Sequence, residues 1–297
     1  MKVNWGDRGI GGKIASGPRR HNGIREAGPH TARPFGFSPR VVLKGPPPRT
    51  LYKPRRRWYD PPVKRLAHYP HCTACAARTR GLFSSLAGAQ LLKLDRTKVA
   101  HEYSRGQIIF YEGNPPLAVY CVSSGVVKLY KAGRGEKKVV IRLLGPGETL
   151  GFRAVIAGEP YAATAEAVEK TTVCAIPKEV FDDVIRNDAD TAFRLIAKLA
   201  AELRISEDEF VSRVQLSVAQ RVARFLLWTL ETLQKPSKTS NRITLPLLRE
   251  EIAQMVGTTP ETLSRVFRDL SDRKILKLDR KTIVVANPRA LRRLMEE

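Results

Sequence analysis

The sequence predicts an α+β protein in which an antiparallel β domain is followed by one long helix and a small helical domain. Three observations support this order: glycine-separated apolar runs in residues 103–177, a heptad-like apolar spacing in residues 188–216, and two short helices joined by a tight turn in residues 250–270. The chain has 297 residues, 42% of them hydrophobic, which suits about two domains with apolar cores.

Composition narrows the broad class of protein. No apolar run approaches the ~18 residues that a transmembrane helix needs, so we expect no membrane partner. Four cysteines in 297 residues do not make a disulfide scaffold, and a cytoplasmic location is the default expectation. The net charge of +23 suggests an anionic partner such as nucleic acid, once the charge is located.

Residues 1–66 are predicted to be a disordered, basic tail. They hold 16 Lys+Arg against 3 Asp+Glu, which gives +13, so the rest of the chain carries 23 − 13 = +10. They also hold 10 of the 20 prolines and show no helical or alternating periodicity. Two interpretations stay open: an arm that adds sequence-independent DNA affinity, or a translation start that really lies further along.

Residues 67–187 are predicted to form the β domain. β-branched and aromatic runs separated by turn glycines are typical of an antiparallel sandwich or barrel. The sequence has no Gly-rich loop followed by Lys-Ser/Thr and no G-x-G-x-x-G opening a helix, which leaves dinucleotide and nucleoside triphosphate chemistry without support. The predicted strands cover residues 107–111, 119–122, 126–130, 139–143 and 172–176.

Residues 188–217 are predicted to form one long helix that joins two copies of the chain. Apolar side chains fall at a and d positions of a heptad, with Ser206 and Arg213 at the other two seam positions. An ordinary helix packed on its own core is the alternative, but the length and the place between two domains favour a homodimer. The predicted seam residues are Ile196, Leu199, Leu203 and Phe210.

Residues 218–297 are predicted to form a helix–turn–helix domain. Gly257 permits a tight turn, Thr259 is a natural N-cap, and Pro260 suits the first position of the second helix. In the helix over residues 260–270 an apolar stripe then alternates with an outward polar, basic face. The stripe consists of Leu263, Val266, Phe267 and Leu270, and the outward face of Glu261, Ser264, Arg265 and Arg268.

A hairpin over residues 277–285 is predicted to follow as a wing, with Arg280 and Lys281 placed to reach phosphates. From residue 242 onward there are 12 Lys+Arg and 8 Asp+Glu, a balance of only +4. The expectation of double-stranded DNA as partner therefore depends on the outward face of the second helix rather than on net charge.

The chain from about Cys72 to the C-terminus strongly resembles the Crp/Fnr family of bacterial transcription regulators. The residues that carry the resemblance are YSRGQIIFYEG at 103–113, SGVVKLY at 124–130, LGPGE at 144–148 and, most specifically, EEIAQMVGTTPETLSR at 250–265. The resemblance implies a β-roll like a cyclic-nucleotide-binding domain, a long dimerisation helix and a C-terminal winged helix–turn–helix. It also implies a regulator rather than an enzyme, with RNA polymerase as a further partner.

The family's DNA contacts map onto Glu261, Ser264 and Arg265, a pattern similar to the Fnr-like branch that reads TTGA-type half-sites. Arg265 can hydrogen-bond guanine O6 and N7, and Glu261 can accept from cytosine N4. Contacts to the DNA backbone are expected from Thr258, Thr259 and Arg268.

Cyclic AMP is not expected as the signal. In the cyclic-AMP-binding branch that the chain resembles less closely, a Glu follows the glycine matching Gly151, and an Arg-Ser pair comes some ten residues later. Here those positions hold Phe152, then Ala162 and Ala163, and Arg153 stands in the wrong register to neutralise a phosphate.

An iron–sulfur cluster is a second candidate, because Fnr-like oxygen sensors hold a [4Fe–4S] cluster with three N-terminal cysteines and one from the β-roll. Cys72, Cys75 and Cys174 resemble three of these ligands, and Cys121 could supply the fourth if its strand faces the site. At the two spacings where relatives place the third N-terminal cysteine, this chain has Gly81 and Phe83.

Other interpretations of the cysteines stay open. Cys174 can be plain core, and Cys72 with Cys75 can be a remnant, a dithiol switch or half a zinc site. An unidentified small ligand, or haem held by His101 or His68, are further alternatives.

Two other functions compete with the regulator. One is a thiol–disulfide oxidoreductase using Cys72 and Cys75, which lacks the expected βαβ context. The other is a cyclic-nucleotide-binding module that regulates another protein, which the altered phosphate pocket and the recognition helix both disfavour.

Overall fold

The computed structural model of the chain describes residues 63–66, 69, 71–133, 138–232, 242–244, 247–279 and 282–295. The predicted tail lies outside the described residues up to residue 62. Its last residues differ from the prediction, because strand β1 (Lys64–Arg65) pairs with β2. Within the described part of the chain, no helix is both long and apolar enough to cross a membrane.

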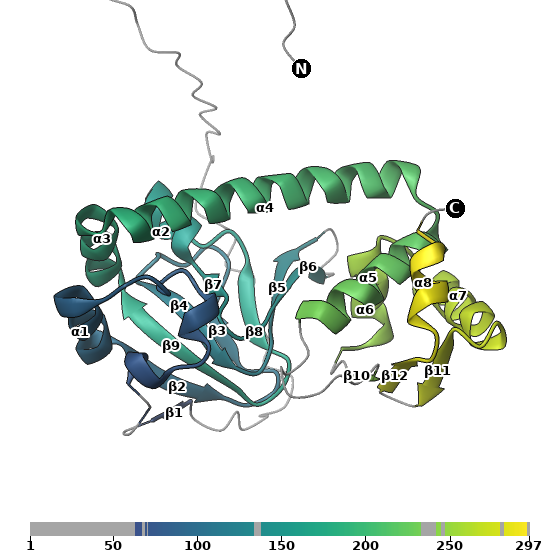
Figure 1. Ribbon diagram of the computed structural model, residues 1–297, viewed down its shortest axis with the longest axis horizontal. Coiled ribbons are helices and arrows are strands. Elements are labelled where there is room, and N and C mark those ends of the chain that lie inside the picture. The colour runs from purple at the N-terminus through teal and green to yellow at the C-terminus, as the bar shows by residue number, and fades with distance from the viewer. Residues whose placement is uncertain are drawn as a thin grey trace, which may run out of the picture. The chain divides into compact units, whose positions relative to one another are not determined.

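The N-terminal domain consists of two antiparallel sheets, as the glycine-punctuated apolar runs predict (Figure 1). One sheet has the order β1-β2-β9-β4-β7 and the other the order β3-β8-β5-β6. Apolar and aromatic side chains from both sheets pack together between them. The strands are β2 (Val99–Tyr103), β3 (Ile108–Phe110), β4 (Ala118–Ser124), β5 (Val127–Ala132), β6 (Lys138–Leu144), β7 (Thr149–Leu150), β8 (Thr164–Ala167) and β9 (Thr171–Pro177).

The turn between β4 and β5 requires glycine. Gly125 has a φ of 81°, and a Cβ at this position would lie 2.5 Å from the Thr171 hydroxyl oxygen. Only a residue without a side chain can therefore connect the two strands here, since both the backbone conformation and the space exclude a Cβ. The turn carries β5 across from the first sheet to the second.

Short helices cover one side of this domain and form its second core. They are η1 (Cys72–Ala74), η2 (Arg78–Arg80), α1 (Gly88–Thr97), α2 (Phe152–Ala157) and α3 (Lys178–Asn187). Phe83 and Phe181 meet edge to face here, with ring centroids 6.3 Å apart. The core includes Cys72, so the loop that carries the Cys72 and Cys75 pair is packed against the sheet rather than lying outside the domain.

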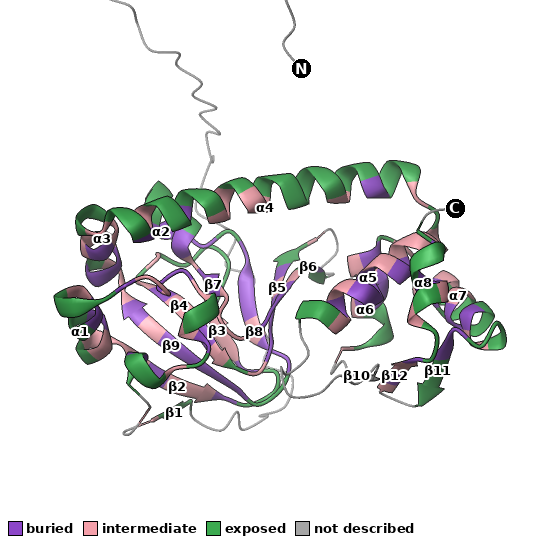
Figure 2. Cartoon of the chain, viewed as in Figure 1, coloured by how far each residue is buried: buried purple, intermediate pink, exposed green. Residues whose placement is uncertain are grey.

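The long helix α4 spans Ala189–Gln215, within one or two residues of the predicted bounds. Asp188 is its N-cap, and its side chain accepts a hydrogen bond from the Thr191 backbone N–H at 2.7 Å. Such a cap satisfies one of the N–H groups that have no partner inside the helix. Most of the surface of α4 is exposed in the single chain (Figure 2).

The C-terminal domain is the predicted winged helix–turn–helix. Helices α5, α6, α7 and α8 pack around one apolar core, and strands β10, β12 and β11 form a small antiparallel sheet in that order. The wing is present as β11 and β12, while Arg280 and Lys281 lie outside the described residues. The elements are α5 (Val218–Thr232), β10 (Arg242–Thr244), α6 (Arg249–Val256), α7 (Pro260–Asp272), β11 (Leu276–Asp279), β12 (Thr282–Val285) and α8 (Pro288–Arg293).

Helix α6 is connected to the β domain through polar contacts. Lys128 on β5 is only 9% exposed, and its ammonium group pairs with Glu166 on β8 at 2.8 Å and with Glu251 on α6. The Val140 backbone N–H on β6 donates to the Gln254 side chain on α6 at 3.1 Å. A buried ammonium group between two carboxylates is compensated in charge and links the two domains.

Candidate nucleic-acid interface and cysteine pocket

The turn between α6 and α7 is built as the sequence predicts. Gly257 ends α6 in the left-handed conformation, with a φ of 74°, and the Thr258 N–H bonds back to the Ala253 carbonyl at 2.9 Å. Thr259 caps α7 by accepting from the Thr262 N–H at 3.3 Å, and Pro260 occupies the first turn. These local signals fix the angle at which α7 leaves the turn.

Helix α7 has one buried and one exposed face, and the predicted division is confirmed. Leu263, Phe267 and Leu270 are at most 1% exposed, whereas Val266 is half-buried at the edge of the core. The side chains predicted to face outward are all exposed: Glu261, Ser264, Arg265 and Arg268. A polar, basic face on the second helix of the motif is the surface that helix–turn–helix proteins place in the major groove.

A short network orients the first two turns of this face. The Arg265 guanidinium donates to the Thr262 hydroxyl at 3.1 Å, and the Ser264 hydroxyl donates to the Pro260 carbonyl at 2.8 Å. The pKa of Glu261 lies below its usual value because the carboxylate accepts from its own backbone N–H and from the Thr259 hydroxyl. Glu261 is therefore an ionised acceptor at neutral pH. Thr262 was not predicted as a functional residue, although its i−3 spacing from Arg265 could have indicated it.

The exposed apolar stripe of α4 differs in part from the predicted seam. Ile196, Leu203 and Phe210 are exposed, the last at 71%, but Leu199 is half-buried against the core of the β domain. Phe193 and Val214, each 72% exposed, extend the stripe in its place. These exposed positions follow a 3-4 spacing along residues 193–214, with Ala200 and Glu207 at the intervening positions. The exposed positions therefore lie one residue beyond three of the positions named for the seam.

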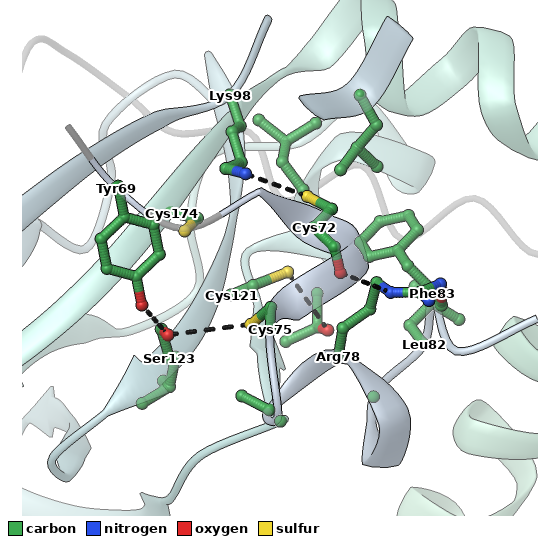
Figure 3. A pocket seen from close by; sticks show the side chains of 17 residues that line it. Tyr69, Cys72, Cys75, Arg78, Leu82, Phe83, Lys98, Cys121, Ser123 and Cys174 are labelled. Carbon is green, nitrogen blue, oxygen red and sulfur yellow. Dashed lines mark hydrogen bonds between the residues drawn. The ribbon is translucent and has the colours of Figure 1, made fainter. Parts of the chain in front are cut away.

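All four cysteines of the chain line one cavity, which we call the cysteine pocket (Figure 3). Cys72 and Cys75 come from the η1 segment, Cys121 from β4 and Cys174 from β9. Cys121 and Cys174 are directly opposite each other in the β4–β9 register. The condition that β4 must turn Cys121 towards the other cysteines is therefore met. All four residues are free thiols.

Polar side chains hold the η1 segment in place. The Asp95 carboxylate accepts from the Cys72 backbone N–H at 2.7 Å and from His71 at 2.5 Å, and it pairs with Lys98. Arg78 donates to the Cys72 carbonyl at 2.8 Å and also to three carbonyl groups of the following loop. His71 is turned towards Asp95 and does not line the pocket.

The thiols lie in an apolar environment with few polar contacts. Lys98 Nζ donates to Cys72 Sγ at 3.1 Å, and Cys75 Sγ is 3.9 Å from Ser123 Oγ, which also bonds the Tyr69 hydroxyl. Burial raises the pKa of Cys121 and of Cys174 to about 12, and the neighbouring thiols add to the shift of Cys121. Burial also raises the pKa of Cys72, although Lys98 opposes the shift. These three side chains are protonated thiols at neutral pH.

Comparison with known proteins assigns both domains. A family model described as the cyclic nucleotide-binding domain matches residues 100–188, and one described as the Crp-like helix-turn-helix domain matches residues 220–294. The nitrogen fixation regulation protein FixK of Bradyrhizobium diazoefficiens is 31% identical over 199 residues, which cover 67% of this chain and 83% of the relative. The chain belongs to the Crp/Fnr family.

Further members show the same relationship. The cyclic AMP receptor protein of Thermus thermophilus is 32% identical over 183 residues, covering 62% of this chain and 82% of that protein. The solved structure of FixK2 from Bradyrhizobium japonicum matches with a TM-score of 0.60 and 28% identity, covering 66% of this chain and 96% of that one. Such homologues are transcription regulators, so this Crp/Fnr protein is a DNA-binding regulator and not an enzyme.

The positions aligned with the cyclic AMP phosphate site lack the expected polar groups in this Crp/Fnr chain. Phe152 is buried in the apolar core, and Ala163 is buried as well. Arg153 is exposed, and its guanidinium is 4.0 Å from Glu202 on α4. Neither Phe152 nor Ala163 offers a charged partner for a phosphate.

The chain lacks the third N-terminal cysteine with which Fnr-like proteins hold a [4Fe–4S] cluster. A side chain at Gly81 would place Cβ 2.7 Å from the Gly147 carbonyl oxygen, and Phe83 is buried in the core. Neither position could thus carry the third N-terminal cysteine without rearrangement. Although four thiols line the pocket, no three His, Cys, Asp or Glu side chains in the described part of the chain come together as a metal-ion site.

Proposed function

We propose that this Crp/Fnr regulator acts as a homodimer that reads an inverted TTGA-like repeat with α7 and is controlled by a signal at its β domain. The observation that carries the proposal is the exposed face of α7, where Glu261, Ser264 and Arg265 stand on one side of a rigidly capped helix. RNA polymerase is the further partner we expect of such a regulator, and DNA as target makes the cytoplasm the expected compartment.

The chemistry of the face suits the bases of that half-site. Arg265 offers a forked pair of donors to guanine O6 and N7, and the Thr262 hydroxyl already holds its guanidinium near the helix. Glu261 is ionised and can accept from cytosine N4 on the complementary strand. Thr258, Thr259 and Arg268 are assigned to phosphates, which fix register without reading sequence.

The α4 stripe supports a two-fold dimer. Large apolar side chains, including Phe193, Leu203 and Phe210, face solvent along one side of α4 in the single chain. A second copy packed on the same stripe would remove them from water and pair the two helices as a coiled coil. The two α7 helices would then enter successive major grooves about 34 Å apart, on the two halves of an inverted repeat.

Contacts between the domains give a signal in the β domain a route to the DNA-binding helices. Lys128 is packed between Glu166 of the sheet and Glu251 of α6, and Glu251 also accepts from the Leu248 N–H at the start of α6. A shift of β5 or β6 would therefore act on the first turn of α6, which packs directly against α7.

The test is fluorescence anisotropy of the full-length protein on labelled duplexes. One duplex carries an inverted TTGA repeat, a second has the half-site guanines replaced by adenine, and a third has five base pairs inserted between the half-sites. We expect the first to bind at least about 30-fold more tightly than the second at one fixed salt concentration, since two wrong base pairs cost about 2–6 kcal/mol. The third should also bind more weakly, because five base pairs turn the two half-sites to opposite sides of the duplex. Equal affinity for all three would refute both the half-site and the dimer.

A further inference from the structure

The convergence of all four cysteines on one cavity is not explained by the proposed DNA binding or by a metal centre. Three separate segments of the fold, η1, β4 and β9, each direct sulfur atoms into the same cavity (Figure 3). The cavity has a volume of about 50 Å³. One water molecule needs roughly 10–15 Å³, so there is room for a small polar molecule such as hydrogen peroxide.

The four thiols differ in accessibility. Cys72 and Cys174 are buried, whereas Cys75, where the η1 segment ends, and Cys121 on β4 are both half-buried. Cys72 is further held by Lys98 at its sulfur and by Arg78 at its carbonyl. Oxidants select cysteines that are accessible and that ionise readily, and burial raises the pKa of the Cys121 thiol to about 12, so Cys75 is the residue that we expect an oxidant to modify first.

Cys121 is the natural partner of Cys75. The sulfur of Cys75 lies 3.9 Å from Ser123 Oγ, and both Ser123 and Cys121 of β4 line the cysteine pocket. Cys75 and Cys121 therefore face the same cavity (Figure 3).

We propose that the cysteine pocket is an oxidation site in which a hydroperoxide converts Cys75 to a sulfenic acid and Cys121 then closes a disulfide with it. In the first step the Cys75 sulfur attacks the O–O bond, gains one oxygen and releases water when the oxidant is hydrogen peroxide. In the second step the Cys121 sulfur displaces the hydroxyl group from Cys75, which leaves as a second water molecule. Two thiols lose two electrons in total, and the peroxide gains them.

The disulfide would tie the η1 segment to β4 by a covalent bond. It would also draw Cys75 away from Ser123 and so disturb the contact between Ser123 and Tyr69. Lys98 and Cys72 lie on the side of the pocket away from Cys75 and Ser123, and they would keep their contact (Figure 3). Disulfide formation does not require DNA binding. Experiments on the thiols can therefore fail or succeed independently of the DNA-binding experiments.

Trypsin separates the three cysteine-bearing segments. Cleavage after lysine and arginine gives peptides 66–78, 106–128 and 171–178, which carry Cys72 with Cys75, Cys121, and Cys174 respectively. The reduced full-length protein is treated with hydrogen peroxide, alkylated, digested without reductant and mapped by mass spectrometry. Free thiols are counted in parallel in denaturant, and iron and zinc are measured in protein purified without oxygen.

We expect the number of free thiols to fall from four to two and a cross-link to appear between peptides 66–78 and 106–128. Cys72→Ala should keep this cross-link, whereas Cys75→Ala should lose it, which identifies the reacting cysteine of the pair. In Cys121→Ala, Cys75 should be trapped as sulfenic acid by dimedone, and Cys174→Ala should behave as the unmodified chain does. Thermal melts of the four reduced variants confirm that each is folded.

Three results would overturn the proposal. The first is four free thiols after peroxide treatment, and the second is a disulfide confined to Cys72 and Cys75 within peptide 66–78. The third is iron or zinc bound at one equivalent or more in the protein purified without oxygen and released on alkylation of the thiols. The last outcome would show that the pocket rearranges around a metal centre instead.

Discussion

Replacement of Arg265 by alanine should remove recognition of one base while leaving the fold intact. Arg265 is exposed and donates a hydrogen bond to Thr262 on its own helix, so the substitution opens no cavity. Exposed substitutions of this kind change the free energy of unfolding by about 0.5 kcal/mol or less. Any large effect on DNA binding can therefore be assigned to the lost guanidinium.

The size of the effect follows from the paired contact. A forked arginine–guanine contact contributes about 1–3 kcal/mol of discrimination, and contributions from well-separated positions add. A two-fold dimer loses two such contacts, or about 2–6 kcal/mol. At about 1.4 kcal/mol for each factor of ten, binding to the inverted repeat should weaken roughly 30-fold to 20,000-fold. Binding to a duplex without the guanines should change little.

Arg268→Ala is the matched control, because it removes the same side chain from the same exposed face of α7. We assign Arg268 to a phosphate contact, so the affinity for the duplex with the guanines and for the duplex without them should fall equally. The slope of log affinity against log salt should also shrink by about 0.9 for each subunit. Anisotropy titrations at four salt concentrations measure both quantities. Retention of the full guanine preference by Arg265→Ala, or its loss in Arg268→Ala, would refute the assignment.

Three further predictions concern the dimer, the domain contact and the η1 segment. Phe210→Asp puts a charge into the exposed stripe of α4 and should give a monomer with unchanged helix content; sedimentation that still shows a dimer would place the interface elsewhere. Lys128→Met leaves two carboxylates without their buried cation and should lower the free energy of unfolding by about 3 kcal/mol or more, whereas Lys138→Met, at an exposed ion pair, should change it little. Burial lowers the pKa of Lys128, but its two carboxylate partners raise it on balance, so its stabilisation is complete at neutral pH and is lost as the pH rises through the raised pKa. The difference in free energy of unfolding between Lys128→Met and the unmodified chain should accordingly narrow in urea titrations at alkaline pH, and a difference that stays constant while the ammonium group loses its proton would contradict the ion-pair account. Asp95→Asn should free the η1 segment and speed alkylation of Cys72 about 10-fold to 150-fold, since a hydrogen bond to a charged acceptor contributes about 1.5–3 kcal/mol. Asp183→Asn serves as control, and equal alkylation rates would show that Asp95 does not hold the segment.

Local sequence signals were sufficient to predict the two helices of the helix–turn–helix motif. Gly257, Thr259 and Pro260 act through backbone conformation and hydrogen bonds within four residues, so their effect can be predicted without knowledge of the rest of the fold. The buried stripe of α7 likewise follows from helical periodicity alone. For the same reason the bounds of α4 were predicted to within two residues.

Several strands were not predicted because their sequence signal is weak. β7 is two residues long, and β8 (Thr164–Ala167) contains alanine and glutamate, which have low strand propensity. These segments are strands because β4 and β5 offer them backbone hydrogen bonds, not because of their own side chains. β1 likewise depends on pairing with β2, which is why the predicted tail extended too far.

The sequence by itself determined the fold class, the exposed polar face of α7 and the presence of a long helix, because each depends on residues that are close together in the chain. Only the tertiary structure decided which side of α4 is exposed. Leu199 packs against the core of the β domain, and Phe193 and Val214 are exposed instead. It also decided that Cys72, Cys75, Cys121 and Cys174 share one pocket. These cysteines are up to about a hundred residues apart, and they meet through the pairing of β4 with β9 and the packing of η1 on the sheet. Contacts between distant segments depend on how whole elements pack, and no local pattern of side chains encodes that arrangement.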